Sequence, residues 1–196
     1  MSALLDLQGV TRRFGGLVAV DSVSTQVRSG ELVGLIGPNG AGKTPLFNLI
    51  SGFTPLSSGQ VTFKGRRIDG LKPWRIARLG IGRTFQNLRI FPNMSVFDNV
   101  SIGAMGGRTI GAWTAFLDGA RSRAISERTY EALEAVGLVD QAADLAANLA
   151  YGKRKYLEIA RALALKPDLL VLDEPAAGLN DTETQALAAF IRRLHA

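Results

Sequence analysis

Residues Gly34–Gly52 read GLIGPNGAGKTPLFNLISG, and this stretch decides the fold. Within it, Gly37–Thr44 fits the pattern G-x-x-x-x-G-K-[ST]. The apolar run Leu32–Ile36 predicts a buried strand before the pattern, and a helix is expected after it. In that context the glycines let the backbone curl so that its N–H groups converge on phosphate oxygens, and the helix N-terminus adds positive charge. The stretch therefore predicts a phosphate-binding loop, or P-loop.

Individual residues of the loop receive distinct roles. Lys43 is expected to reach the β- and γ-phosphates of a nucleotide, and the Thr44 hydroxyl to bind Mg²⁺. Pro45 is unusual, but proline is tolerated in a first helical turn, where its missing N–H has no intrahelical partner. A glycine-rich turn that binds nothing is the alternative, and the complete set of fixed positions disfavours it. The predicted binding loop comprises Gly37, Pro38, Asn39, Gly40, Ala41, Gly42, Lys43, Thr44 and Pro45.

A second acidic site follows the apolar run Leu169–Leu172, which predicts another buried strand. Asp173 and Glu174 stand at the carboxyl end of that strand, where open parallel sheets place their ligands. Alone, such a pair is most often a solvated turn. Together with a P-loop, Asp173 is expected to hold Mg²⁺ and Glu174 to polarise an attacking water.

Composition limits the remaining possibilities. With 196 residues and 46% hydrophobic content, the chain can bury one good core. The absence of cysteine excludes disulfides and thiolate chemistry. No signal peptide or membrane-spanning run is recognised, so a cytoplasmic chain is expected. The net charge of +6 suits nucleic acid, an anionic membrane or phosphate ligands, and because the basic residues look spread along the chain, we expect a solvated surface for most of them.

Short apolar runs alternate with helical patterns, which predicts an α/β fold with a parallel sheet. The glycine-rich stretch 103–111 is the expected flexible loop. The mostly helical stretch 93–165 interrupts the alternation and is expected to form a helical subdomain, whereas residues 1–92 and 166–196 form the core. Further strands are expected at Ser22–Val27 and Gln60–Phe63, and helices at Pro73–Leu79, Ser126–Ala135, Arg154–Leu165 and Thr182–Leu194.

Gln86, at the end of Ile81–Gln86, and the segment Leu149–Leu163 resemble the Q-loop and the signature helix of ABC-transporter ATPases. The resemblance covers essentially the whole chain in the family's order. It implies a P-loop NTPase (RecA-like) core with an antiparallel β part near the N-terminus. It also implies that Phe14 stacks on adenine and that Gln86 contacts Mg²⁺ and the attacking water. Taken singly, Phe14 is better explained as a core aromatic and Gln86 as a surface amide.

The resemblance implies further contacts to the nucleotide. Ala150, Tyr151 and Gly152 occupy the signature position, which in the family faces the γ-phosphate bound by a second ATPase subunit. Residues Ala177–Asn180 occupy the D-loop position. Ala150 and Lys153 stand where the wider family has Ser and Gln, and Lys153 either attracts the γ-phosphate or points to solvent. The implied ligands are ATP and Mg²⁺.

Several stretches look like the ATPase subunits of branched-chain amino-acid importers, namely Thr11–Gly16, Thr84–Val100, Leu149–Gly152 and Asp173–Asn180. This implies ATP hydrolysis that drives solute import, with the solute carried by separate subunits. The implied partners are a second ATPase subunit, the same or related, paired head to tail; transmembrane permease subunits; and indirectly a periplasmic solute-binding protein. No nucleic acid is expected, and the implied location is the inner face of the cell membrane.

Two features leave alternatives open. The family has a strand and a switch histidine after the helix Thr182–Leu194, whereas the only histidine here, His195, is expected at the surface of that helix. We therefore expect a shortened C-terminus and impaired hydrolysis. A nucleotide-binding fragment without hydrolysis, or a soluble ABC ATPase outside transport, remains the alternative. Within Asn87–Val100, the apolar side chains are expected either to receive a permease helix or to join the subdomain core.

Overall fold

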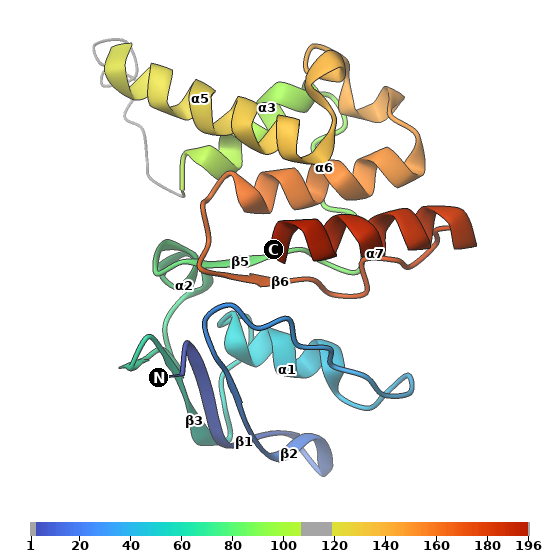
Figure 1. Ribbon diagram of the computed structural model, residues 1–196. Helices are drawn as coiled ribbons and strands as arrows, with labels where there is room; N and C mark the ends of the chain where they lie inside the picture. Colours follow the sequence, from blue (N-terminus) through green and yellow to red (C-terminus); the bar gives the residue numbers. More distant parts are fainter. Residues whose placement is uncertain (1–2, 107–118, 196) are drawn as a thin grey trace. The chain divides into compact units, whose positions relative to one another are not determined.

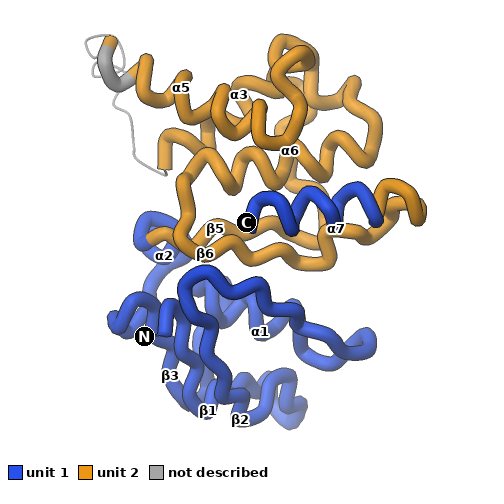
Figure 2. The backbone as a smooth tube through the Cα atoms, viewed as in Figure 1, with its two compact units in different colours: residues 1–79, 185–196 blue, residues 80–184 orange. Residues whose placement is uncertain are grey.

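The computed structural model describes residues 3–106 and 119–195. The chain divides into two compact units, residues 1–79 with 185–196 and residues 80–184 (Figures 1 and 2). These bounds differ from those of the expected core and helical subdomain, because strands from both ends of the stretch 80–184 pair with each other. The division into a core and a helical subdomain remains a prediction.

The first unit is built on an antiparallel sheet with the strand order β2-β1-β3-β4. A tight turn at Gly15 and Gly16 joins the two longest strands. Residues of alternating burial, such as Leu5 and Leu7 on β1, turn one face of the sheet inward. The four strands are β1 (Leu5–Phe14), β2 (Leu17–Val27), β3 (Ser58–Phe63) and β4 (Arg66–Arg67).

Helices α1 (Lys43–Ile50) and α2 (Pro73–Arg78) also belong to the first unit, together with residues 185–195 of α7 (Asp181–His195). Leu46, Leu49 and Ile50 form the buried face of α1. Helix α2 starts with a proline at its first position, as expected from the fixed φ of proline, and buries Ile76. The expected strand at residues 60–63 and the following turn are confirmed, and so is the strand at 22–27.

The prediction of a buried strand at Leu32–Ile36 is wrong. Residues 31–38 form no strand, and Leu32 and Ile36 are 56% and 95% exposed. The reason is the lack of a neighbour: no strand among the described residues pairs with this segment. An extended apolar run becomes a buried strand only where another strand accepts its backbone hydrogen bonds.

The second unit combines a short parallel sheet with helices (Figure 1). Strands β5 (Ile81–Arg83) and β6 (Leu169–Val171) pair in parallel, with Ile81 opposite Leu169 and Arg83 opposite Val171. The parallel sheet predicted from the alternation is thus present. The helices are α3 (Val96–Ala104), α5 (Gly119–Val136), α6 (Tyr151–Leu163) and the first turn of α7 (Asp181–His195), with one-turn helices at Val139–Gln141 and Ala146–Asn148.

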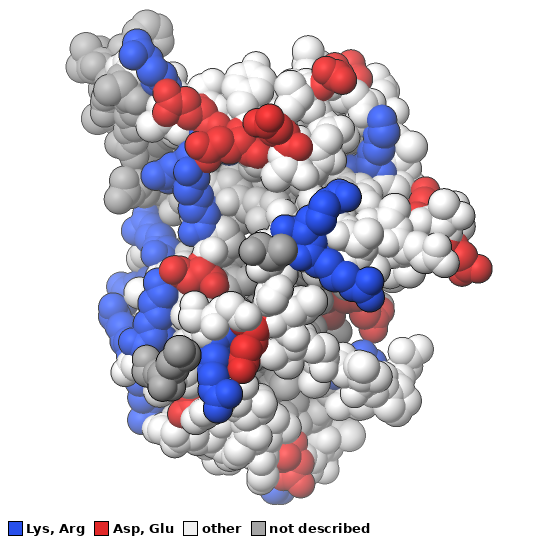
Figure 3. Space-filling view, in the orientation of Figure 1, with Lys and Arg blue, Asp and Glu red and all other residues white. Residues whose placement is uncertain are grey.

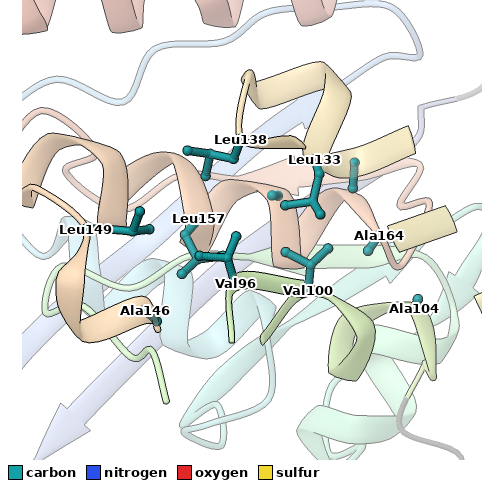
Figure 4. Packing of buried hydrophobic residues seen from close by; sticks show 11 residues of the cluster. Val96, Val100, Ala104, Leu133, Leu138, Ala146, Leu149, Leu157 and Ala164 are labelled. Atoms are coloured by element: carbon teal, nitrogen blue, oxygen red, sulfur yellow. The ribbon is translucent and has the colours of Figure 1, made fainter. Parts of the chain in front are cut away.

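Helices α3, α5 and α6 enclose an apolar core (Figure 4). Val100, Leu133 and Leu157 are fully buried there. Gly103 allows α3 to approach α6, since an added Cβ would collide with the carbonyl oxygen of Arg161. Gly103 therefore lies inside a helix rather than in the expected flexible loop, and residues 107–111 of that loop are outside the described residues. None of the described helices combines the length and apolar content needed to cross a bilayer.

Candidate functional site

The P-loop lies between residues 37 and 44 of the first unit, and its last two residues begin helix α1. Gly40 and Gly42 adopt positive φ angles of 83° and 85°, which glycine adopts without strain. A Cβ at residue 42 would also collide with the carbonyl oxygen of Ala19 on β2. Both requirements exclude any other residue at Gly42, so the loop's tight curve depends on it.

The N-terminus of α1 is open to an anion. Gly42 caps the helix without a side-chain hydrogen bond, and the first turn contains no acidic residue. Pro45 leaves α1 intact to Ile50, as expected, although it removes one N–H from the first turn. The N–H groups of a first helical turn and the helix dipole make such an end suitable for phosphate.

Lys43 at the start of α1 folds back over the loop. Its Nζ donates to the carbonyl oxygens of Gly37 at 2.7 Å and of Pro38 at 2.9 Å. The ammonium group is thus held across the mouth of the loop by neutral acceptors. A phosphate oxygen offers a charged acceptor, and charge-assisted hydrogen bonds are about twice as strong as neutral ones.

Phe14 is 47% exposed at the end of β1, so the alternative of a core aromatic is not what the structure shows. The guanidinium carbon of Arg12 lies 4.3 Å from the centre of its ring. The guanidinium covers one face of the ring, so a planar base would stack on the other face or displace Arg12. Its assignment to adenine remains a prediction.

The second unit brings three predicted residues to one edge of its parallel sheet. Gln86 follows β5, while Asp173 and Glu174 follow β6, and parallel strands end at the same edge. The Gln86 side-chain amide donates to the Glu174 carboxylate at 2.8 Å. Glu174 adopts a φ of 47°, an uncommon value for a residue with a side chain, which marks a position held by its surroundings.

Asp173 is 1% exposed and faces a residue that the sequence did not single out. Arg83 donates from Nη2 to Asp173 Oδ2 at 3.1 Å, and both side chains are buried. Burial lowers the pKa of Arg83, whereas the hydrogen bond and charge of Asp173 oppose that shift. The sequence signal was available: Arg83 ends one parallel strand as Asp173 follows the other, so the sheet edge brings opposite charges together.

Two side chains of helix α6 form hydrogen bonds with the main chain of the Q-loop. Phe85 N–H donates to Glu158 Oε1 at 3.2 Å, and Lys155 Nζ donates to the Gln86 carbonyl oxygen at 3.4 Å. Glu158 and Lys155 are each 3% exposed. Neither role was predicted from the sequence, because both residues look like ordinary polar positions of a surface helix. They position the residue whose side chain meets Glu174.

Burial raises the pKa of Glu158, and the opposing hydrogen bonds and positive charges offset only part of that shift. A raised folded-state pKa means that the folded chain binds more protons than the unfolded one, so this residue's contribution to stability falls as pH rises. We expect Glu158→Gln, which retains an acceptor for Phe85, to gain stability relative to the parent as pH increases above about 4.3, the ordinary pKa of glutamic acid.

Urea unfolding of both proteins across pH 4 to 8 checks this expectation. The exposed residue Glu134 supplies the matched control, and Glu134→Gln should follow the parent at every pH. A difference between Glu158→Gln and the parent that stays constant with pH would contradict the assignment.

The signature residues lie at the start of α6, next to the D-loop. Ala150 caps the helix, and the Tyr151 hydroxyl donates to the Ala177 carbonyl oxygen at 3.4 Å. A Cβ on Gly152 would lie 2.8 Å from Glu183 Oε1, so this position requires glycine or a shift of that side chain. Asn180 and Glu183 exchange side-chain to backbone hydrogen bonds of 2.9 and 3.0 Å at the start of α7, a capping box.

The residues whose roles the sequence left open lie in different environments. Lys153 donates to the Gln141 side chain at 2.7 Å, so it is engaged within its own unit. Phe97 packs against the apolar core and against Tyr130 at 5.2 Å between ring centres. Phe91 is 45% exposed, with Arg161 5.8 Å from its ring centre. His195 is exposed as expected, and its Nε2 lies 2.9 Å from the Gly30 carbonyl oxygen.

Known proteins resemble the chain along its length. It is 45% identical over 195 residues to the high-affinity branched-chain amino acid transport ATP-binding protein LivG of Salmonella typhimurium, covering 97% of this chain and 76% of that protein. The corresponding protein BraF of Pseudomonas aeruginosa is 42% identical over 199 residues, with the same coverage.

Solved structures of ABC-transporter cassettes share the fold of the chain. The ADP conformation of an ATP-binding cassette of an ABC transporter superposes with a TM-score of 0.86 at 30% identity, covering all of this chain and 78% of that one. This confirms the predicted P-loop ATPase fold. The sequence profile described as ABC transporter matches residues 20–177. With these relatives, the match shows that the chain belongs to the family of ABC transporter ATP-binding proteins.

Proposed function

We propose that the chain binds ATP with Mg²⁺ and hydrolyses it to drive the import of branched-chain amino acids through permease subunits. The observation that carries the proposal is the 2.8 Å hydrogen bond between Gln86 and Glu174 at the carboxyl ends of β5 and β6. It joins an amide and a carboxylate, the two groups needed to orient and deprotonate a water. The solute is inferred from the names of LivG and BraF.

The residues present fit both ligands. The start of α1, which lacks a side-chain cap, and the ammonium of Lys43 suit the phosphates of ATP. Among residues 3–106 and 119–195 no group of three or more acidic, histidine or cysteine side chains gathers. Mg²⁺ is nevertheless compatible, because it is usually held by one or two protein ligands together with substrate phosphates. Thr44, Gln86 and Asp173 would supply oxygen ligands, and the metal would neutralise phosphate charge.

Each protein group then has a chemical task. Lys43 releases the carbonyl oxygens of Gly37 and Pro38 and donates instead to phosphate oxygens. Glu174 accepts the proton of the water that attacks the γ-phosphate, and Gln86 keeps its carboxylate in place. The attacking water forms the new P–O bond, the bond to the β-phosphate oxygen breaks, and ADP leaves.

The proposal also includes protein partners. Ala150, Tyr151 and Gly152 would contact the nucleotide held by a second ATPase subunit, identical or related, in a head-to-tail pair. Permease subunits would contact the segment Asn87–Val100, where Phe91 is exposed. Such contacts would put the chain at the inner face of the membrane, and a periplasmic solute-binding protein would act only through the permease.

The test compares ATP binding and turnover in the parent and in Lys43→Ala. We expect binding to weaken at least about a hundredfold in the variant, since it loses the charge-assisted bonds to two phosphates. Fluorescent-nucleotide titration measures affinity and phosphate release measures turnover. Arg128→Ala, at an exposed position of α5, serves as the control and should bind as the parent does.

The outcomes separate an ATPase from a nucleotide-binding protein without hydrolysis. Binding and turnover in the parent support the enzyme. Binding without turnover supports a nucleotide-binding protein without hydrolysis. Unchanged affinity in Lys43→Ala would refute the P-loop assignment.

A further inference from the structure

The net positive charge of the chain is concentrated in one short segment. Residues 64–78 contain six basic side chains and one acidic one, and so account for +5 of the net +6. Most of the 23 basic residues lie outside this segment, as expected, but there acidic residues nearly balance them. We name this segment the basic patch; its members are Lys64, Arg66, Arg67, Lys72, Trp74, Arg75 and Arg78.

All seven side chains of the basic patch are exposed. Figure 3 shows lysines and arginines gathered on the side of the molecule that carries α2. Asp69, the acidic residue of the segment, is engaged by Arg67, whose Nη2 lies 2.9 Å from Asp69 Oδ2. The remaining basic side chains give the surface a strong excess of positive charge.

The patch is a fixed surface rather than a loose loop. Ile68 and Ile76 are 1% and 2% exposed and anchor the segment in the core of the first unit. Strand β4 pairs with β3, where Arg66 lies opposite Phe63, and the Ile68 N–H donates to the Val61 carbonyl oxygen at 2.9 Å. A Cβ on Gly52 would collide with Ile76, so α2 packs closely on the turn after α1.

Trp74 gives the patch an apolar component. It is 45% exposed, and the guanidinium carbons of Arg75 and Arg78 lie 5.1 and 4.9 Å from its ring centre. Tryptophan flanked by long basic side chains is typical of the membrane interface, where the ring sits at headgroup level and the charges meet lipid phosphates. In nucleic-acid binding a base would stack on the ring, but two guanidinium groups already lie against it.

We propose that the basic patch contacts an anionic lipid surface directly. The inference rests on the charge and exposure of these residues and is independent of the proposed ATPase activity. Each basic residue near an anionic leaflet raises the partition coefficient by about fivefold, so a patch of this size suffices for reversible attachment. ATP hydrolysis and lipid contact can therefore fail separately in experiment.

The experiment measures sedimentation of the full chain with vesicles of equal parts phosphatidylglycerol and phosphatidylcholine, and with phosphatidylcholine alone. We expect binding only to the anionic vesicles, weakened by salt. The triple variant Arg66→Gln, Lys72→Gln, Arg75→Gln should lower the partition coefficient by about a hundredfold. The matched variant Arg123→Gln, Arg128→Gln, Arg193→Gln removes three exposed charges elsewhere and should change it by less than about tenfold.

A second readout tests the orientation. The chain has two tryptophans, Trp74 and Trp113, so Trp113→Phe leaves Trp74 as the single reporter. Its emission should shift to the blue on binding anionic vesicles. No shift, or equal losses in the two triple variants, would overturn the proposal. Tighter binding to duplex DNA than to the anionic vesicles, lost in the patch variant, would assign the patch to nucleic acid instead and equally overturn it.

Discussion

Glu174→Gln lowers ATP turnover by about a thousandfold and leaves nucleotide affinity nearly unchanged. A general base contributes about two to four orders of magnitude, and an amide cannot take the proton. Glutamine has nearly the same shape and still accepts the hydrogen bond from Gln86, which is 2.8 Å long in the parent. The variant therefore removes the chemistry and retains the geometry.

Single-turnover phosphate release, measured beside nucleotide titration, checks this expectation. Glu134→Gln makes the same change of side chain at an exposed position of α5 and should keep full turnover. Turnover within tenfold of the parent in Glu174→Gln would show that the proton goes to another group, and the role of Glu174 would have to be abandoned.

Asp173→Ala lowers the free energy of unfolding by about 3–5 kcal/mol, a typical loss when one partner of a buried ion pair is removed. The side chains of Arg83 and Asp173 are 5% and 2% exposed. Without the carboxylate, the guanidinium of Arg83 remains in a site where burial already lowers its pKa. Most of the loss is expected to come from that charge rather than from the missing hydrogen bond.

The double variant Arg83→Met, Asp173→Ala distinguishes this cause from simple loss of packing. Replacing both charges should recover most of the stability, because no buried charge remains. Urea unfolding of the parent, both single variants and the double variant gives the interaction energy. If the losses in the two single variants simply add in the double variant, the pair does not stabilise the fold as argued.

The elements that were predicted correctly carry their signal in adjacent residues. Helix α2 follows from Pro73, α5 and α7 from their apolar spacing, and the turn after β3 from Gly65. The prediction of a strand at Leu32–Ile36 was wrong because apolar content indicates only that a segment is suited to burial. Whether the segment forms a strand depends on a partner strand from a distant part of the chain. Local patterns cannot reveal that dependence.

Some residues of the candidate site could also be predicted from local patterns, and others could not. The P-loop, Gln86 and Glu174 were recognisable because short patterns or a known family order mark them. Lys155 and Glu158 were missed, since their roles arise from contacts with residues 69 and 73 positions away in the sequence. Long-range contacts of single charged side chains leave no periodic trace.

The attachment of the Q-loop to α6 has a mechanical consequence. A loop tied at one point can pivot, but Phe85 and Gln86 are held through both an N–H donor and a carbonyl acceptor by residues one helical turn apart. Two attachments restrict rotation of the loop more than one would. A displacement of the signature helix is therefore expected to be transmitted to the Q-loop, and a displacement of the Q-loop to the helix, through these two hydrogen bonds.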